Sequence, residues 1–400
     1  MQKKSYRILA ILLMFALVMS VFLLSSCKQK QGSTDGMNAS NSSAEGKHDS
    51  TEVLIEGDKP ALGIPELSGT GGYTDPVNSD EAGQVSAGGE AKPAGSSTGE
   101  KPSGENPPEA KPTEVKKVAQ PDPSKPAVSY VKTPTASGTK VETSDVSGES
   151  VIDYSNVSQG YVMLKNSGAA NKLKALVITP NGIQYQYILE SDGKFIVCPL
   201  QAGNGKYAIH IAENVSGTTY QPLVSVEVDV ALADANLPFL YPNHRVNFSE
   251  SSACVAKAAD LTRGMTSDLH KIESIYNYII ENIKYDQSKV NGLQSKSEYI
   301  PDPDRTLREG KGICSDFSSL LAAMLRSQNI PTKMIEGYAA PGNIEHAWNL
   351  IYTKEKGVIV TEIEFNGTWR ILDSTYGSSL GKDLERFIGN GSGYGEKFVY

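Results

Sequence analysis

The sequence predicts an α+β protein in which the folded part follows a long disordered segment. Between Tyr161 and Val230, short runs rich in β-branched and aromatic residues are separated by turn signals such as Asn181-Gly182, a pattern typical of antiparallel strands. After Leu232 the apolar residues recur at helical spacing, and further strand-like runs follow from Thr332 onward. Strands and helices therefore occupy different stretches of the chain, as they do in α+β folds.

Residues 1–27 have the pattern of an export signal. Three basic residues precede an apolar run from Ile8 to Leu24, and two serines then lead into Cys27. The end of this run resembles a bacterial lipobox, in which cleavage leaves the cysteine as a lipidated N-terminus. The alternative is an uncleaved transmembrane anchor, because the run is almost long enough to span a bilayer. In either case we expect the rest of the chain to be extracytoplasmic and anchored to the cell membrane.

Residues 28–148 consist mainly of Gly, Ser, Pro, Glu, Lys and Thr, with Tyr73 and Tyr130 as the only aromatic residues. Such a segment cannot bury enough apolar surface to offset its chain entropy. Repeated Lys-Pro steps favour extended conformations. We therefore predict a disordered tether that carries the folded part away from the membrane.

Residues 149–232 are predicted to form a small antiparallel β-sandwich, because several short strands at this spacing are typical of that fold. Cys198 lies in an apolar run, which predicts a buried free cysteine. No pattern in this region indicates catalysis, so the domain is either a spacer or a binding module. The predicted strands are Tyr161–Leu164, Ala175–Ile178, Ile183–Leu189, Phe195–Leu200, Tyr207–Ile211 and Leu223–Val230.

Residues 233–400 are predicted to form a second domain. Helices are expected over Ala253–Leu261 and from Leu269 onward, where Ser267 offers an N-cap oxygen. The segment Gln287–Gly310 is polar and contains two prolines, so we expect a loop. A third helix, with one apolar face, begins near residue 314. The strands expected after it are Thr332–Tyr338, His346–Tyr352, Val358–Phe365 and Trp369–Leu372.

Cys314 directly precedes this third helix and follows Gly310 and Gly312. The unpaired amides and the positive dipole end of a helix N-terminus favour a thiolate over a thiol. The same amides suit the oxyanion of a tetrahedral intermediate, and the glycines let a substrate backbone approach closely. A cysteine near an apolar helix usually serves in packing, but Cys314 precedes the apolar face. We therefore predict that Cys314 is a nucleophile.

His346 is the only histidine downstream of Cys314, and it opens a strand-like run. Asp373 ends the next apolar run, on a strand that could lie beside the first. In that arrangement the imidazole acts as a base for the thiol, and the carboxylate fixes its tautomer. The alternatives are a structural histidine and a turn aspartate. Asp316, by contrast, is predicted to be a first-turn residue that interacts with the helix dipole.

Five short blocks surround these residues in a definite order. They are Gly312-x-Cys314-x-Asp316, Ile330-Pro331, Glu336-Gly337-Tyr338, His346-Ala347-Trp348 and Trp369-x-x-Leu372-Asp373-Ser374-Thr375. In order and spacing they resemble the bacterial transglutaminase-like superfamily, over about Leu261 to Tyr376. The resemblance implies a papain-like α+β core, acyl chemistry through a thioester at Cys314, and an additional oxyanion donor, for which Tyr285 is the candidate.

The superfamily includes transglutaminases, peptidases, deamidases, peptide N-glycanases and inactive members. The resemblance therefore implies a cysteine hydrolase or acyltransferase without fixing the reaction. We expect peptide or protein substrates of the cell envelope. Hydrolysis is favoured over transamidation, because water is always present whereas an amine acceptor needs its own binding site. The alternative from another class is a catalytically silent binding module of the envelope.

Composition argues against other kinds of partner. The net charge is −8 and no basic cluster is present, so no nucleic acid is expected to bind. No cluster of metal ligands accompanies the predicted catalytic residues, so neither a metal nor an organic cofactor is expected. The four cysteines are too few and too dispersed for a disulfide framework.

Overall fold

The computed structural model describes residues 119–400 apart from the gaps 145–148, 294–298, 341, 360–362, 381–383, 385–387 and 389. The predicted export signal with Cys27, and the predicted tether up to residue 118, lie outside the described residues. Among the residues that are described, no helix has both the length and the apolar character needed to cross a membrane. Helices and strands both contribute substantially, which confirms the predicted α+β class.

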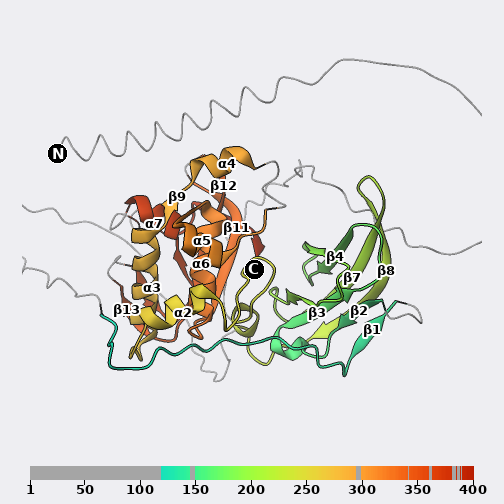
Figure 1. Ribbon diagram of the computed structural model, residues 1–400, viewed down its shortest axis with the longest axis horizontal. Helices are drawn as coiled ribbons and strands as arrows, with labels where there is room; N and C mark the ends of the chain where they lie inside the picture. Colours follow the sequence, from blue (N-terminus) through green and yellow to red (C-terminus); the bar gives the residue numbers. More distant parts are fainter. Residues whose placement is uncertain are drawn as a thin grey trace, which may run out of the picture. The chain divides into compact units, whose positions relative to one another are not determined.

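Strands β1 to β8 form two four-stranded antiparallel sheets that pack against each other (Figure 1). The strand orders are β1-β2-β3-β6 and β5-β4-β7-β8. Cys198 is fully buried between them, as its apolar surroundings predicted. The strands are β1 (Val141–Thr143), β2 (Ser150–Asp153), β3 (Tyr161–Asn166), β4 (Leu173–Ile178), β5 (Gln184–Leu189), β6 (Ile196–Pro199), β7 (Gly205–Ser216) and β8 (Thr219–Val230).

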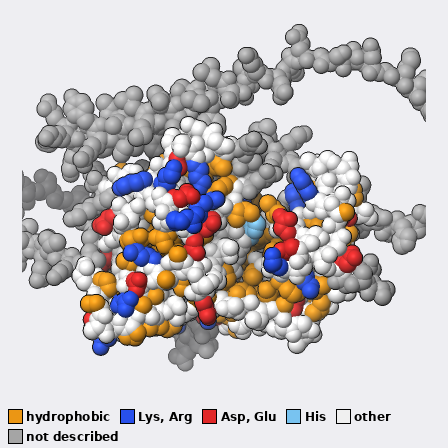
Figure 2. Space-filling model, viewed as in Figure 1, with side chains coloured by type: hydrophobic (Ala, Val, Ile, Leu, Met, Phe, Trp, Pro, Cys, Tyr) orange, Lys and Arg blue, Asp and Glu red, His pale blue; other side chains and the backbone are white. Residues whose placement is uncertain are grey.

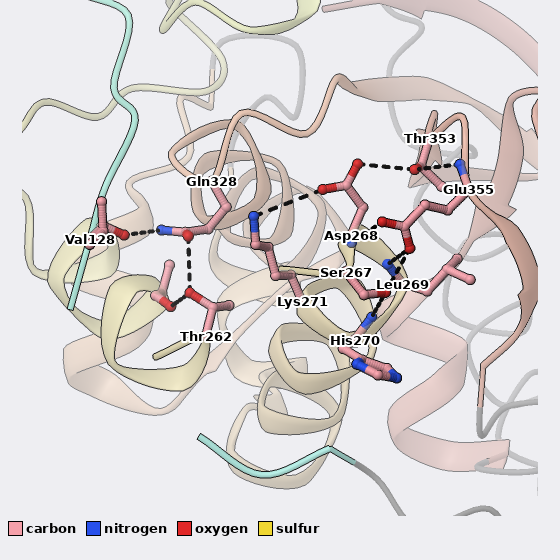
Figure 3. Close-up of polar contacts among 11 residues, drawn as sticks. Val128, Thr262, Ser267, Asp268, Leu269, His270, Lys271, Gln328, Thr353 and Glu355 are labelled. Carbon is pink, nitrogen blue, oxygen red and sulfur yellow. Dashed lines mark hydrogen bonds and ion pairs between the residues drawn. The ribbon is translucent and has the colours of Figure 1, made fainter. Parts of the chain in front are cut away.

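Residues 119–140, which we call the strap, were predicted to belong to the disordered tether. In the structure they lie along folded elements. The backbone amide of Tyr130 donates to the carbonyl oxygen of Ser327 at 2.7 Å. The side-chain amide of Gln328 donates to the carbonyl oxygen of Val128 at 3.1 Å (Figure 3). The tether prediction is therefore wrong for the strap, and it is also wrong for Val141–Thr143, which form β1. Composition measures how much apolar surface a segment can bury, but the strap is ordered by backbone hydrogen bonds to its neighbours.

In residues 253–400, α6 packs against a four-stranded sheet of order β15-β12-β11-β16 (Figure 1). Within the described residues its helices are α2 (Ala253–Leu261), α3 (Asp268–Asn282), α4 (Gln287–Gly292), α5 (Pro303–Glu309), α6 (Cys314–Arg326) and α7 (Ser374–Leu380). Its strands are β9 (Lys284–Tyr285), β10 (Lys311–Gly312), β11 (Thr332–Ala339), β12 (Ile344–Ile351), β13 (Lys356–Val358), β14 (Glu364–Asn366), β15 (Arg370–Leu372) and β16 (Tyr394–Val399).

The predicted loop Gln287–Gly310 is wrong in part, because it contains α4 and α5. The carboxylate of Asp286 caps α4 by accepting from the amide of Lys289 at 3.1 Å. The carboxylate of Asp302 caps α5 in the same way, and a proline follows it at the first helical position. The predicted strand Val358–Phe365 is instead a hairpin of β13 and β14.

The N-terminus of α3 is held to the connection between β12 and β13 (Figure 3). Ser267 is its N-cap residue, as predicted, and accepts from the amide of His270. The carboxylate of Glu355 accepts from the Ser267 hydroxyl at 2.6 Å and from the Asp268 amide at 2.9 Å. Because a negative charge at a helix N-terminus is stabilising, this contact secures the α3 end next to the sheet.

Two hydrogen bonds fix the register of α6 against β12. The Ser318 hydroxyl donates to the carbonyl oxygen of Trp348 at 2.8 Å, and the Asn349 side chain donates to the carbonyl oxygen of Ser318 at 3.0 Å. Ser318 lies one helical turn after Cys314, and Trp348 lies two strand residues after His346. The pairing therefore carries Cys314 and His346 to the same end of the helix–sheet interface.

Candidate active site

Cys314 is the first residue of α6. The structure describes three cysteines, of which Cys198 and Cys254 are buried and Cys314 is partly exposed. Burial raises the pKa of the Cys198 and Cys254 thiols, which makes both of them unreactive. Among the described cysteines, Cys314 alone combines solvent access with a helix N-terminus.

Asp316 holds this helix end in place, which is more than the predicted dipole interaction. Its carboxylate is fully buried and accepts from the backbone amide of Ile313 at 2.8 Å. It also pairs with the Lys289 ammonium at 2.6 Å and accepts from the Tyr299 hydroxyl at 2.5 Å. A Cβ atom on Gly312 would come within 2.5 Å of the Asp316 Cβ, so only glycine fits there.

His346 and Asp373 meet because their strands are neighbours in the sheet. β12 pairs with β15 in antiparallel register, and Asp373 follows directly after β15. The Nε2 atom of His346 lies 2.7 Å from Oδ2 of Asp373. His346 is 8% exposed and Asp373 is 0% exposed, so solvent does not weaken this contact. The structure therefore brings these two predicted residues into direct contact.

The protonation of His346 follows from its two partners. Burial by itself lowers the pKa of the imidazole, but the Asp373 carboxylate and a hydrogen bond with Cys314 raise the pKa to about 10. Because Nε2 bonds to Asp373, the nitrogen available to the Cys314 sulfur is Nδ1. Near neutral pH the imidazole is therefore a cation that lies beside the Cys314 sulfur.

Residues 255–373 match the family model of the Transglutaminase-like superfamily. The matched segment contains Cys314, His346 and Asp373, in the geometry just described. The matched segment is a transglutaminase-like domain. The match begins within α2 and ends at the aspartate that contacts His346.

Curated relatives share this domain over part of their length. The Kyphoscoliosis peptidase of Mus musculus is 28% identical over 132 residues, which cover 30% of this chain and 18% of that protein. The human Kyphoscoliosis peptidase is 26% identical over 132 residues, with the same shares covered. Uncharacterized protein YebA of Bacillus subtilis is 26% identical over 123 residues, or 26% of this chain and 16% of that protein. The chain therefore spans less than a fifth of the length of these relatives.

Beyond its contact with His346, the Asp373 carboxylate of the transglutaminase-like domain has two further donors. Its Oδ1 atom accepts from the backbone amide of Tyr376 at 2.9 Å. Its Oδ2 atom accepts from the Tyr394 hydroxyl at 3.0 Å. The backbone carbonyl of Asp373 also accepts from the Tyr276 hydroxyl at 3.2 Å. The donors Tyr376 and Tyr394, together with His346, satisfy the hydrogen bonding of a carboxylate that water cannot reach.

Aromatic rings lie along the imidazole. The Tyr376 ring stacks on His346 at a centroid distance of 4.6 Å, and the Trp348 ring lies nearly parallel to it at 6.2 Å. Trp348 is 1% exposed, so its ring is part of the core beside the imidazole. Tyr376 and Tyr394 were not among the predicted site residues, and both lie beyond the segment that matches the family model.

Tyr285, the predicted oxyanion donor, is placed beside the nucleophile by a short parallel strand pair. In the pairing of β9 with β10, Tyr285 lies opposite Gly312, two residues before Cys314. Burial and the charge of a Cys314 thiolate both raise the pKa of Tyr285. The ring is still 45% exposed, so a substrate could reach it. Tyr285 therefore stays protonated and able to donate a hydrogen bond near the sulfur.

Proposed function

We propose that this chain is an extracytoplasmic thiol-dependent acyl-transfer enzyme that acts on amides of peptides or proteins. The observation that supports this proposal best is the placement of His346 between two groups. It bonds to the buried Asp373 carboxylate and to the partly exposed Cys314 at the start of α6. A nucleophile, a base and an orienting carboxylate are the parts that acyl transfer requires.

The proposed reaction begins when the Cys314 thiolate attacks an amide carbonyl carbon. The tetrahedral intermediate collapses as the C–N bond breaks, and the His346 imidazolium gives its proton to the departing amine. A thioester then joins the acyl group to Cys314. A water molecule attacks the thioester carbonyl carbon while His346 removes a proton from that water. The C–S bond then breaks, which releases a carboxylic acid and restores the thiolate–imidazolium pair. An amine in place of water would give transamidation.

We propose hydrolysis as the prevailing outcome, since water is present at any exposed thioester. Over α4 and α5, Figure 2 shows basic side chains gathered together with a few acidic side chains among them. The test is to incubate the purified protein with a peptide library, with and without an added primary amine, and to record mass changes.

Each outcome of this experiment has a distinct mass signature. Cleavage splits a peptide, deamidation adds about 1 Da, and transamidation adds the amine less the ammonia that leaves. Cleavage or deamidation that persists without the amine supports hydrolysis. Products that appear only with the amine would make transamidation the reaction. If no product forms and peptides bind unchanged, the domain is the catalytically silent binding module.

We propose further that Cys27 is lipidated and holds the protein on the outer side of the cell membrane, where peptides and proteins of the envelope are its substrates. The sequence around Cys27 supports this assignment, because two small residues precede the cysteine after a basic and apolar leader. The mass of the mature N-terminal peptide tests it. An unacylated N-terminus would reject the lipid anchor.

Replacing Tyr285 with phenylalanine tests the oxyanion role. The hydroxyl is expected to strengthen its hydrogen bond as charge develops on the carbonyl oxygen, so its loss should lower kcat by about ten- to a hundredfold with little change in KM. Steady-state kinetics on a peptide from the library measures both constants. Tyr220→Phe in β8 is the matched control and should behave like the wild type. An unchanged kcat in Tyr285→Phe would remove Tyr285 from the mechanism.

A further inference from the structure

Tyr394 contacts the proposed catalytic residues from an element that the family match does not include. It is the first residue of β16, which pairs with β11 at the edge of the sheet, with Tyr394 opposite Ala339. Its ring packs on Trp348 at a centroid distance of 4.9 Å and 66° between the ring planes. The backbone pairing and this ring contact together hold the hydroxyl in a fixed place.

The hydroxyl of Tyr394 shares an oxygen atom with His346. Asp373 Oδ2 accepts from Tyr394 at 3.0 Å and lies 2.7 Å from the imidazole Nε2. Because an ionised carboxylate only accepts hydrogen bonds, the tyrosine must be the donor. Burial and the Asp373 charge raise the pKa of Tyr394, so this donor keeps its proton throughout the working pH range.

We propose that Tyr394 is a positioning residue whose hydroxyl holds the Asp373 carboxylate toward His346. By donating a hydrogen bond to Oδ2, the hydroxyl also weakens the attraction between the carboxylate and the imidazolium. The expected effect of Tyr394 on turnover rests on the proposed function. Its expected effect on the pKa of His346 does not. Without the hydroxyl, Oδ2 would interact with the imidazole alone. The imidazolium would then hold its proton more tightly and would be a poorer acid toward the departing amine.

Other ionisable groups near His346 have to be distinguished from this effect. Cys314 from α6, Asp373 after β15 and Tyr376 from α7 face the imidazole, while Tyr285 from β9 and Tyr276 from α3 act through Cys314 or Asp373. Tyr276 provides the matched control, because its hydroxyl donates to the backbone carbonyl of Asp373 and not to the carboxylate. Tyr276→Phe removes a hydroxyl beside the same residue without touching the shared oxygen.

The experiment is an NMR titration of histidine-labelled protein with the wild-type sequence, with Tyr394→Phe and with Tyr276→Phe. The chain has five histidines, so the His346 signal can be assigned by substituting the others. In Tyr394→Phe we expect the titration midpoint of His346 to rise by about 0.5 pH unit or more, while Tyr276→Phe leaves it in place. On a substrate, kcat should fall by about tenfold with KM unchanged.

Two results would overturn the proposal. One is a His346 midpoint that does not rise in a folded Tyr394→Phe, and the other is an equal rise in Tyr276→Phe, which would indicate general loosening. Thermal unfolding establishes that each variant is folded. If no substrate is ever turned over, the titration still decides the role of Tyr394, so failure of the proposed function and failure of this inference are distinguishable.

Discussion

Replacing Cys314 with alanine is expected to abolish turnover, with a loss of about ten-thousandfold or more in kcat. The thiolate forms the covalent bond to the acyl group, and none of the other described cysteines is accessible to replace it. The side chain is partly exposed and precedes the apolar face of α6, so the free energy of unfolding should change by less than about 1 kcal/mol. Hydrolysis kinetics and urea unfolding measure the two effects separately.

The matched control for this prediction is Cys254→Ala. Cys254, in α2, is 0% exposed and packs in the hydrophobic core. Removing its side chain should therefore reduce the stability of the protein and leave kcat unchanged. The opposite pattern, in which Cys314→Ala retains activity and Cys254→Ala does not, would be incompatible with the assigned nucleophile. Retention of activity in both variants would show that neither Cys314 nor Cys254 is the nucleophile.

Replacing Asp373 with asparagine is expected to lower kcat by about a hundredfold. In serine hydrolases the equivalent change costs about ten-thousandfold, because an amide supports the wrong tautomer of the histidine. A cysteine enzyme should be less sensitive, since its resting state is already a thiolate paired with an imidazolium. Asparagine has nearly the same volume as aspartate, so the fold should persist. Initial rates across pH measure the effect.

The pH profile of Asp373→Asn has a definite direction. In the wild type the pKa of His346 is raised to about 10, so the imidazolium persists through neutral pH and is lost as pH rises toward that value. Without the carboxylate, burial lowers the pKa, and the alkaline limit of activity should move down by more than one pH unit. Unchanged rates and an unchanged alkaline limit in a folded variant would exclude Asp373 from the mechanism.

The same pair links stability to pH. His346 has an ordinary pKa of 6.5 and a folded pKa raised to about 10, so its contribution to stability is fully present below pH 6.5 and is lost as pH rises toward about 10. Asp373→Asn should lack this pH dependence.

Much of the candidate site could be predicted because its signals are local. Glycines followed by a cysteine and then an apolar helical face indicate a residue at a helix N-terminus, and the structure places Cys314 there. His346 and Asp373 meet because β12 and β15, although separated by the β13–β14 hairpin, are neighbours in the sheet. Asp286 and Asp302-Pro303 are also local helix-start signals, but the polar composition and the prolines of residues 287–310 led to the prediction of a loop there.

Other features depend on contacts that the local sequence does not contain. Tyr394 begins β16, whose sequence Tyr-Gly-Glu-Lys-Phe-Val carries two charges and a glycine and has little strand character by itself. Its pairing with β11, more than fifty residues earlier in the chain, makes it a strand. The strap is similar, because the hydrogen bonds that order Val128 and Tyr130 come from Gln328 and Ser327. Neither Tyr394 nor the strap has a local motif that would have revealed it.

The most direct test of the account is the pH dependence of Cys314 alkylation in the wild-type protein. Iodoacetamide is added between pH 5 and pH 9, and mass spectrometry follows each cysteine, with the buried Cys198 and Cys254 as internal controls. An ordinary thiol such as glutathione slows by about a hundredfold between pH 8 and pH 6, because its thiolate disappears. We predict that Cys314 loses less than about threefold over the same interval, because His346 keeps it as a thiolate. If Cys314 slows in parallel with glutathione, the thiolate–imidazolium pair does not exist and the proposed mechanism is wrong.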